Sequence, residues 1–151
     1  MPQNFAILLS DYQTIMNKGL PLKRFGQNYL HDQNIIKKII DEIAPNENES
    51  IIEIGTGRGA LTEHLFNSKA NLTAIEIDKR VIDDLKHRFT DLNLLQYDFL
   101  DLDLKQFITI ENQKLRIVGN IPYNITSPIL FKLFDNNTII NDAVFMVQLE
   151  V

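Results

Sequence analysis

Three glycines at alternate positions make "EIGTGRGALT" the stretch of this sequence best suited to hold a ligand. Gly55, Gly57 and Gly59 follow a short apolar run, and residues without a Cβ let the backbone turn tightly and come close to a ligand. The spacing also fits G-x-G-x-x-A through Ala60, the pattern of a nicotinamide dinucleotide loop, although a third glycine two residues after the second is unusual for that pattern. A plain strand-to-helix turn would use glycines too. These residues alone leave a cofactor loop and a structural turn open.

Two acidic residues stand where the next two apolar runs end. Glu76 lies 21 residues after Gly55, the distance at which an acid in a nucleotide-binding sheet accepts hydrogen bonds from a ribose diol. Asp98 ends "LLQYD" and is placed to accept from an adenine amino group. An exposed strand-end glutamate and an aspartate that caps a loop are the alternatives. Because no G-x-x-x-x-G-K-[ST] loop accompanies these acids, we expect an adenosine rather than a nucleoside triphosphate.

The stretch "GNIPYNI" offers chemistry toward an aromatic amine. The side-chain oxygen of Asn120 and the backbone carbonyl of Ile121 are two acceptors, while Pro122 fixes the loop and has no N–H to compete with them. Two acceptors that hold both N–H bonds of an exocyclic amine out of the ring plane make its nitrogen more nucleophilic. Tyr123 offers a ring on which an extruded base can stack. The bare string also fits a simple turn, so its meaning depends on where the fold places it.

The elements that must position these residues follow from the apolar pattern. Isoleucines with helical spacing predict a helix that begins after Asp32, its N-cap, and stops near Pro45. The other apolar runs predict strands at 50–55, 71–78, 92–98, 114–120 and 142–151, and helices at 60–68, 79–89 and 127–136. Strands that alternate with helices predict an α/β fold, an open doubly wound parallel sheet. Ligands bind beyond the carboxyl ends of the strands in such sheets, which is where the glycines, the acids and Asn120 stand.

The charge is uneven along the chain. Residues 1–40 hold five basic and two acidic side chains, net +3, whereas the whole chain of 151 residues carries −5. Residues 1–31 show no strong periodicity and are predicted to be a basic arm, and residues 32–151 are predicted to be one domain. A basic arm on an acidic body fits a phosphate-binding surface. A solvated charged face explains it as well.

Several classes of protein are disfavoured. The chain has no cysteine and its three histidines show no ligand spacing, so we expect no disulfide and no metal site. No apolar run approaches the roughly 18 residues of a membrane span, and the N-terminus lacks the basic flank of a signal peptide, which favours the cytoplasm. Val151 lies inside the last predicted strand. We therefore expect a piece of a longer protein whose last strand has an uncovered edge prone to association.

Six segments that cover nearly the whole chain carry a resemblance to a known family: "LKRFGQNYLHDQNII", "IIEIGTGRGALTEHL", "AIEIDKR", "QYDFLDLDL", "GNIPYNITSPILFKLF" and "FMVQLEV". They resemble the rRNA adenine N6,N6-dimethyltransferases, which use S-adenosyl-L-methionine. The resemblance implies a Rossmann-like sheet of the class I methyltransferase type. It places cofactor contacts on Asn28, Leu30, Gly55, Glu76, Asp98 and Asn120, to which the glycine spacing adds Gly57. It also implies that Lys23, Arg24 and Gln27 lie beside the RNA.

The resemblance implies that two methyl groups are transferred in turn to the exocyclic N6 of adenines in small-subunit rRNA during ribosome maturation. The residues at the reacting amine are then Asn120, Ile121, Pro122 and Tyr123. No dedicated general base is needed, because the amine becomes acidic once methylated and loses its proton to water. We expect a monomer that acts in the cytoplasm without metal or membrane. Relatives continue with two more strands and a small helical RNA-binding domain, so this chain is expected to bind cofactor without dimethylating RNA.

Three other functions stay open. Within the family, the alternative is a large-subunit rRNA adenine methyltransferase of the macrolide-resistance type, although "KRFGQNYLHD", "TSPILFKLF" and "MVQLEV" favour the small-subunit branch. An NAD-dependent dehydrogenase would need a hydride-transfer acid in the cleft, and His31, His64 and His87 lie off the predicted strand ends. A non-catalytic RNA-binding assembly factor would keep the basic arm but would not need Asn120 and Tyr123.

Overall fold

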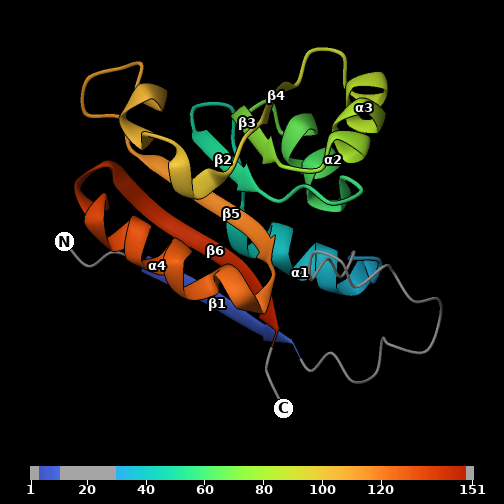
Figure 1. The fold of residues 1–151 in the computed structure, drawn as a ribbon, viewed down its shortest axis with the longest axis horizontal. Helices are drawn as coiled ribbons and strands as arrows, with labels where there is room; N and C mark the ends of the chain where they lie inside the picture. The colour runs from blue at the N-terminus through green and yellow to red at the C-terminus, as the bar shows by residue number, and fades with distance from the viewer. Residues whose placement is uncertain (1–3, 11–29, 149–151) are drawn as a thin grey trace.

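Six parallel strands form one sheet in the computed structural model, which describes residues 4–10 and 30–148. The strands are β1 (Asn4–Ser10), β2 (Ser50–Ile54), β3 (Asn71–Glu76), β4 (Asn93–Gln96), β5 (Leu115–Ile121) and β6 (Ile140–Gln148). Their order across the sheet is β1-β6-β5-β2-β3-β4, and every neighbouring pair is parallel (Figure 1). All five strands predicted from the apolar runs are present, and the predicted open parallel sheet is confirmed.

In the described part of the chain, four α-helices lie between strands, and each overlaps a predicted helix. They are α1 (Gln33–Ile43), α2 (Ala60–Asn67), α3 (Lys79–Arg88) and α4 (Thr126–Asp135); the connections also hold the 3₁₀ helices η3 (Phe99–Asp101), η4 (Leu104–Phe107), η5 (Tyr123–Ile125) and η6 (Asn137–Ile139). Asp32 caps α1 as predicted, because its Oδ1 accepts from the N–H groups of Asn34 and Ile35 at 2.8 and 3.2 Å. Across residues 4–10 and 30–148, no helix has the length and apolar character needed to cross a membrane.

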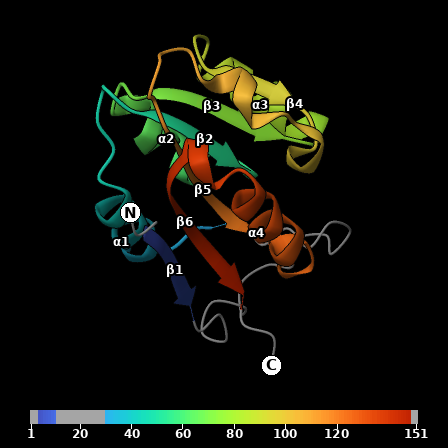
Figure 2. The ribbon, with the colours of Figure 1, turned by 90° about the vertical axis from the view of Figure 1, so that its left-hand side faces the viewer.

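Helices cover both faces of the sheet. Figure 2 shows α1 and α4 on opposite sides of it. On one face, Ile39 of α1 and Leu65 of α2 join a buried cluster with Ile51 of β2. On the other face, Ile129 of α4 joins a second cluster with Ile52 of the same strand. Because both faces are covered, β2 is buried at every residue, and the central strands read in the sequence as continuous apolar runs.

Gly119 allows the two central strands, β2 and β5, to approach each other closely. It stands opposite Ile54 in the parallel register, and a Cβ added to it would lie 2.5 Å from the carbonyl oxygen of Ile54. A side chain does not fit at that distance without moving the backbone, so the position requires glycine. The next residue, Asn120, is thereby held at the carboxyl end of β5, beside the glycine loop that follows β2.

The N-terminal segment differs from the prediction. The sequence shows no strong periodicity in residues 1–31, yet residues 4–10 form β1, which pairs with β6 along all seven of its residues. The expectation of an uncovered edge on the last strand is therefore wrong for the part of β6 that β1 covers. The stretch "FAILL" has strand-forming residues. Its partner comes from the opposite end of the sequence, so no local pattern reveals the pairing.

Candidate active site

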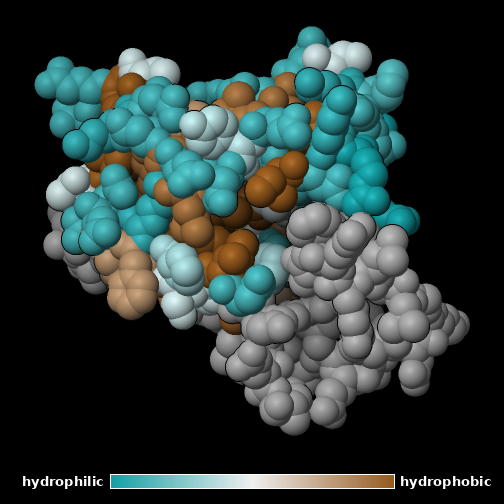
Figure 3. Space-filling model, viewed as in Figure 1, coloured by the Kyte–Doolittle hydropathy of each residue, from teal (hydrophilic) through white to brown (hydrophobic). Residues whose placement is uncertain are grey.

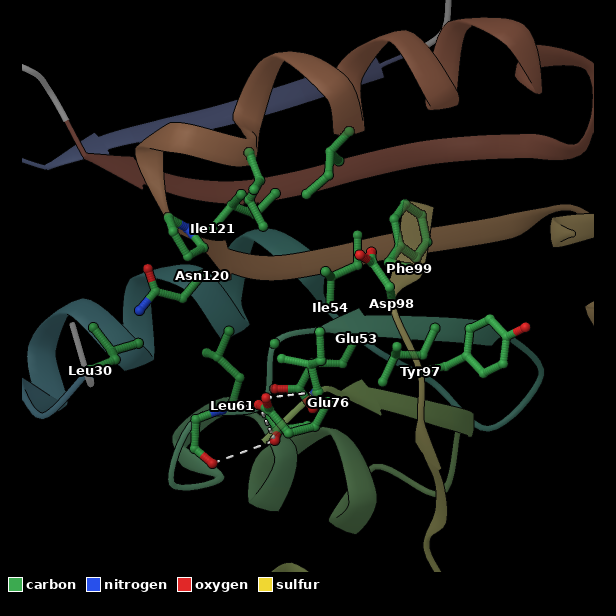
Figure 4. A pocket seen from close by; sticks show the side chains of 18 of the residues that line it. Leu30, Glu53, Ile54, Leu61, Glu76, Tyr97, Asp98, Phe99, Asn120 and Ile121 are labelled. Atoms are coloured by element: carbon green, nitrogen blue, oxygen red, sulfur yellow. Dashed lines mark hydrogen bonds between the residues drawn. The ribbon is translucent and has the colours of Figure 1, made fainter. Parts of the chain in front are cut away.

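A pocket of about 340 Å³ opens at the carboxyl ends of β2, β3, β4 and β5, the edge at which ligands bind in such sheets. Most of the predicted site residues line it: Leu30, Gly55, Gly57, Glu76, Asp98, Asn120, Ile121 and Pro122. Figure 4 shows Glu76, Asp98 and Asn120 around the cavity, and Figure 3 shows a hollow with hydrophobic side chains in the middle of the molecule. The fold thus gathers residues that are far apart in the sequence.

The glycine loop after β2 needs residues without a Cβ for two different reasons. Gly55, Gly57 and Gly59 have positive φ angles of 69°, 53° and 83°, which side chains rarely allow. At Gly59 an added Cβ would also lie 2.8 Å from Leu85 Cδ2, so this glycine lets α3 pack against the start of α2. At Gly55 the nearest atom to an added Cβ, the carbonyl oxygen of Asn120, is 3.8 Å away. The first two glycines line the pocket, and the third serves the packing beside it.

Glu76 is buried at the end of β3 with four hydrogen-bond donors on its carboxylate. One oxygen accepts from Thr56 Oγ1 and from Gly57 N, both at 3.2 Å. The other accepts from the N–H groups of Ile77 and Asp78 at 2.8 and 3.0 Å. Dashed lines in Figure 4 mark hydrogen bonds of this group, which ties the end of β3 to the glycine loop. The spacing indicates the place of Glu76, but nothing in the sequence points to Thr56.

Glu53 is an acid to which the sequence patterns assign no role. It lines the pocket although only 1% of its surface is exposed, and its Oε2 accepts from Thr62 Oγ1 at 2.7 Å. Burial raises the pKa of Glu53 to about 8; the Thr62 hydrogen bond opposes this shift, and the charge of Glu76 adds to it. The signal that reveals it is an acid inside the apolar strand "SIIEI", because acids are seldom fully buried.

Asp98 caps a short helix and also lines the pocket. Its Oδ1 accepts from Leu100 N at 2.9 Å, which makes it the N-cap of η3. The loop-capping alternative for this residue is thus observed, and within residues 30–148 its Oδ2 accepts no further bond. Ile77 directly follows Glu76 in the chain, and Tyr97 directly precedes Asp98. They are 58% and 51% exposed and add apolar surface to the pocket lining.

The segment after β5 forms another wall of the pocket. Asn120 and Ile121 end the strand, and Pro122 follows them along the lining. The carbonyl oxygen of Pro122 accepts from Ile125 N and from Thr126 Oγ1, both at 3.2 Å. The chain therefore turns directly from the strand end into α4, and the predicted acceptors stay at the pocket.

Some predicted site residues lie outside the described part of the chain. Lys23, Arg24, Gln27 and Asn28 are among them, so their contacts with RNA and cofactor remain predictions. The backbone of Tyr123 begins η5, and its side chain is not among those that the structure describes. In the two described ranges, no three or more His, Cys, Asp or Glu side chains are grouped so as to hold a metal ion.

Known proteins similar to this chain place it in a family. The sequence model described as "Ribosomal RNA adenine dimethylase" matches residues 21–151. The chain belongs to this family. Ribosomal RNA small subunit methyltransferase A of Histophilus somni (strain 2336) is 44% identical over 137 residues, and that of Pseudomonas syringae pv. tomato is 46% identical over 132 residues. Each match covers 85% of this chain and 49% of the relative, so the chain spans about half the length of these curated relatives.

Solved structures share the fold. The 23S rRNA methyltransferase ErmE aligns with a TM-score of 0.67 and 26% identity, over 81% of this chain and 48% of its own. A dimethyladenosine transferase from Plasmodium falciparum aligns with a TM-score of 0.66 and 28% identity, over 80% of this chain and 43% of its own. The resemblance carried by the six segments is therefore confirmed, and so is the class I methyltransferase type of the sheet.

Proposed function

We propose that this chain is the cofactor-binding and catalytic domain of an enzyme that transfers two methyl groups from S-adenosyl-L-methionine to N6 of adenines in small-subunit rRNA. The observation that carries the proposal is the pocket in which Asn120, Glu76 and Asp98 meet at neighbouring strand ends. The relatives named as small subunit methyltransferase A, at 44% and 46% identity, support the substrate.

The pocket residues fit an adenosine. Glu76 is placed to accept from a ribose diol if its bonds to Thr56 and Gly57 are exchanged for bonds to the two hydroxyls. The Oδ2 of Asp98 is an acceptor for an adenine amino group, and the apolar surfaces of Ile77 and Tyr97 suit the faces of the base. A volume of about 340 Å³ lies within the usual range of small-molecule sites. These features favour S-adenosyl-L-methionine as cofactor.

The chemistry of the chain's own residues is positional. When bound, the cofactor supplies an electrophilic methyl group on a sulfonium. The Asn120 amide oxygen and the Ile121 carbonyl accept hydrogen bonds from the two N–H groups of the target amine and direct its lone pair. Pro122 offers no competing N–H, and Tyr123 stacks on the target base. Because methylation makes the amine acidic, its proton passes to water and no side chain has to act as a base.

The proposed partner is rRNA, and the proposed setting is a cytoplasmic monomer without a metal. Lys23, Arg24 and Gln27 contribute RNA contacts from the basic arm. We expect these few charges to be too few to hold a structured RNA at physiological salt, since affinity for phosphates grows with the number of basic contacts. The chain alone is therefore expected to bind cofactor, and to modify RNA only in a longer version.

The large-subunit alternative has one observation in its favour, the structural match to ErmE at 26% identity. The small-subunit relatives are more similar in sequence, at 44% and 46% identity, and this difference supports the small-subunit substrate. A dehydrogenase lacks support in the pocket, because no histidine is among its described lining residues.

Two measurements test the proposal. Calorimetric titration of the chain should show binding of S-adenosyl-L-methionine and none of NAD. A version extended by the C-terminal half of a close relative should then methylate unmodified small ribosomal subunits and leave large subunits unmodified, while the unextended chain should methylate neither. Binding of NAD alone would overturn the cofactor, and methylation of large subunits alone would overturn the substrate.

A further inference from the structure

The ammonium group of Lys132, in α4, donates hydrogen bonds to the backbone of a different segment. Its Nζ donates to the carbonyl oxygens of Leu100 and Leu102 at 2.8 and 2.5 Å, and lies 5.6 Å from the centroid of the Phe99 ring. The side chain is half-buried. Within residues 30–148 no carboxylate forms an ion pair with it. A charge removed from water without a carboxylate partner needs such acceptors, so these contacts fix where the ammonium lies.

The segment that Lys132 holds is the one that carries Asp98. Asp98 caps the N-terminus of η3 through Leu100 N, and the Lys132 ammonium donates to the carbonyls of Leu100, the middle residue of η3, and of Leu102, its C-cap. The short helix is thereby held at both termini, where backbone groups lack intrahelical partners. Asp98, Phe99 and Leu100 all line the pocket, so the contact determines the position of one pocket wall.

The helix that carries Lys132 begins at a second wall. α4 starts at Thr126, whose hydroxyl donates to the Pro122 carbonyl, directly after the strand end with Asn120. Thr126 and Lys132 are six residues apart, about 9 Å along a helix. Ile129, between them, packs in the same buried cluster as Phe99. One helix therefore contacts two walls of the pocket. Its first turn contacts the segment that begins with Asn120, the Asn120 wall, and Lys132 contacts the segment of Asp98, Phe99 and Leu100, the Asp98 wall.

We propose that Lys132 is a positioning residue that fixes the Asp98 wall of the pocket relative to the Asn120 wall. The inference rests on the proposed function, in which Asp98 receives the amino group of the cofactor's adenine. Without the ammonium, the carbonyls of Leu100 and Leu102 lose their donor and turn toward water, and Asp98 moves with them. As a consequence, the pocket should lose its preference for a ligand with an adenine amino group over one without it. This loss of preference is separate from any loss of stability.

The test compares two ligands that differ at that amino group. S-adenosylhomocysteine and its hypoxanthine counterpart, S-inosylhomocysteine, are titrated into the 151-residue chain by calorimetry at 20 °C. The variants are Lys132→Met, which keeps the apolar stem without donors, and Lys132→Arg, which keeps the charge. The matched control is Lys38→Met, an exposed lysine on α1 across the sheet. Thermal denaturation of each protein records stability separately.

The wild-type chain and the Lys38→Met control should prefer the adenine ligand. In Lys132→Met the affinity for S-adenosylhomocysteine should fall about tenfold, with a much smaller change for the hypoxanthine ligand, and Lys132→Arg should restore most of the preference. Equal losses for both ligands, or no loss, would reduce Lys132 to a stabilising contact and overturn the inference. If Lys132→Met does not fold, Lys132→Gln decides by the same comparison. Failure of the wild-type chain to bind either ligand would overturn the proposed cofactor, and this inference with it.

Discussion

On one side of the pocket, the Glu76 carboxylate joins the end of β3 to the glycine loop through two hydrogen bonds and accepts two more from the residues that follow it. On the other side, the segment after β5 has a packed part, because Ile121 and Ile129 are buried in one cluster, and the Pro122 carbonyl accepts hydrogen bonds from Ile125 N and Thr126 Oγ1. We call these the Glu76 wall and the Asn120 wall. The first wall depends on one carboxylate that collects several donors, and apolar packing contributes to the second.

This difference separates two kinds of substitution. Loss of a polar group in the Glu76 wall leaves backbone N–H groups without acceptors, which costs stability as well as cofactor affinity. Loss of a side chain that only faces the substrate in the Asn120 wall leaves the packing unchanged. We therefore expect cofactor binding to respond to the first wall and to Asn120, and turnover alone to respond to side chains of the second wall that face only the target base.

The largest expected effect comes from the strand pair that joins the two walls. Gly119→Ala would place a Cβ 2.5 Å from the Ile54 carbonyl oxygen, so β2 and β5 have to separate. We expect the free energy of unfolding to fall by about 2 to 3 kcal/mol, measured by urea denaturation. The control is Gly55→Ala, where the nearest atom is 3.8 Å away and only the positive φ is strained, at about 1 kcal/mol. If both variants lost the same free energy of unfolding, the close approach of β2 and β5 at Gly119 would not be what holds the two walls together.

The next effect belongs to the Glu76 wall alone. Glu76→Ala should weaken S-adenosyl-L-methionine binding by roughly 1 to 3 kcal/mol, because the ribose acceptor is lost. It should also lower the melting temperature, since four donors lose their acceptor. Thr56→Val, the milder variant, removes one of these donors and should leave most of the affinity. If calorimetry showed unchanged cofactor affinity in Glu76→Ala, Glu76 would not be the acceptor for the ribose hydroxyls.

The Asn120 wall is tested by Tyr123→Ala in the extended version. Stacking of a base on an aromatic ring is worth roughly 1 to 3 kcal/mol, so turnover on small subunits should fall about tenfold to a hundredfold. Cofactor affinity should stay within about threefold of the wild-type value, because the proposed contact is made to the target base. Asn120→Ala, by contrast, should weaken both. The comparison between the walls fails if Tyr123→Ala loses cofactor affinity and keeps its turnover.

Sequence patterns predict the local features of the fold and of the site, but not the contacts between distant segments. Helical and apolar periodicity predicts the strands and helices, and the spacing from Gly55 predicts the place of Glu76, because both signals are local. The contacts of Thr56 and Lys132 depend on how loops cross between elements, and no periodicity records that. β1 is missed for the same reason, since its pairing partner is the last strand. The role of Asp98 is ambiguous in the sequence because one side chain both caps η3 and lines the pocket.

The last effect is the smallest when it is counted per unit of pH, and it concerns Glu53, which lines the pocket on the Glu76 side. Its pKa is about 8 in the folded protein against a usual value of 4.5, so the folded chain holds this proton more tightly than the unfolded chain. Between these pH values the unfolded state is ionised and the folded state is protonated. The free energy of unfolding should therefore fall as pH rises, by at most about 1.4 kcal/mol per pH unit. The stabilisation is complete below about pH 4.5 and is lost above about pH 8.

Glu53→Gln keeps the shape of the side chain and removes the titration, so urea denaturation from pH 5 to 8 should show a flatter dependence than in the wild-type chain. The difference in free energy of unfolding between the two proteins at each pH removes the contribution of the titrating groups that they share. Because the charge of Glu76 contributes to the raised pKa of Glu53, Glu76→Gln should flatten part of the same dependence, while Tyr123→Ala should leave it unchanged. Identical slopes for the wild-type chain and Glu53→Gln would mean that Glu53 is ionised in the folded protein. The raised pKa of Glu53 would then be wrong, and the hydrogen bond from Thr62 would have to stabilise a buried carboxylate beside the charge of Glu76.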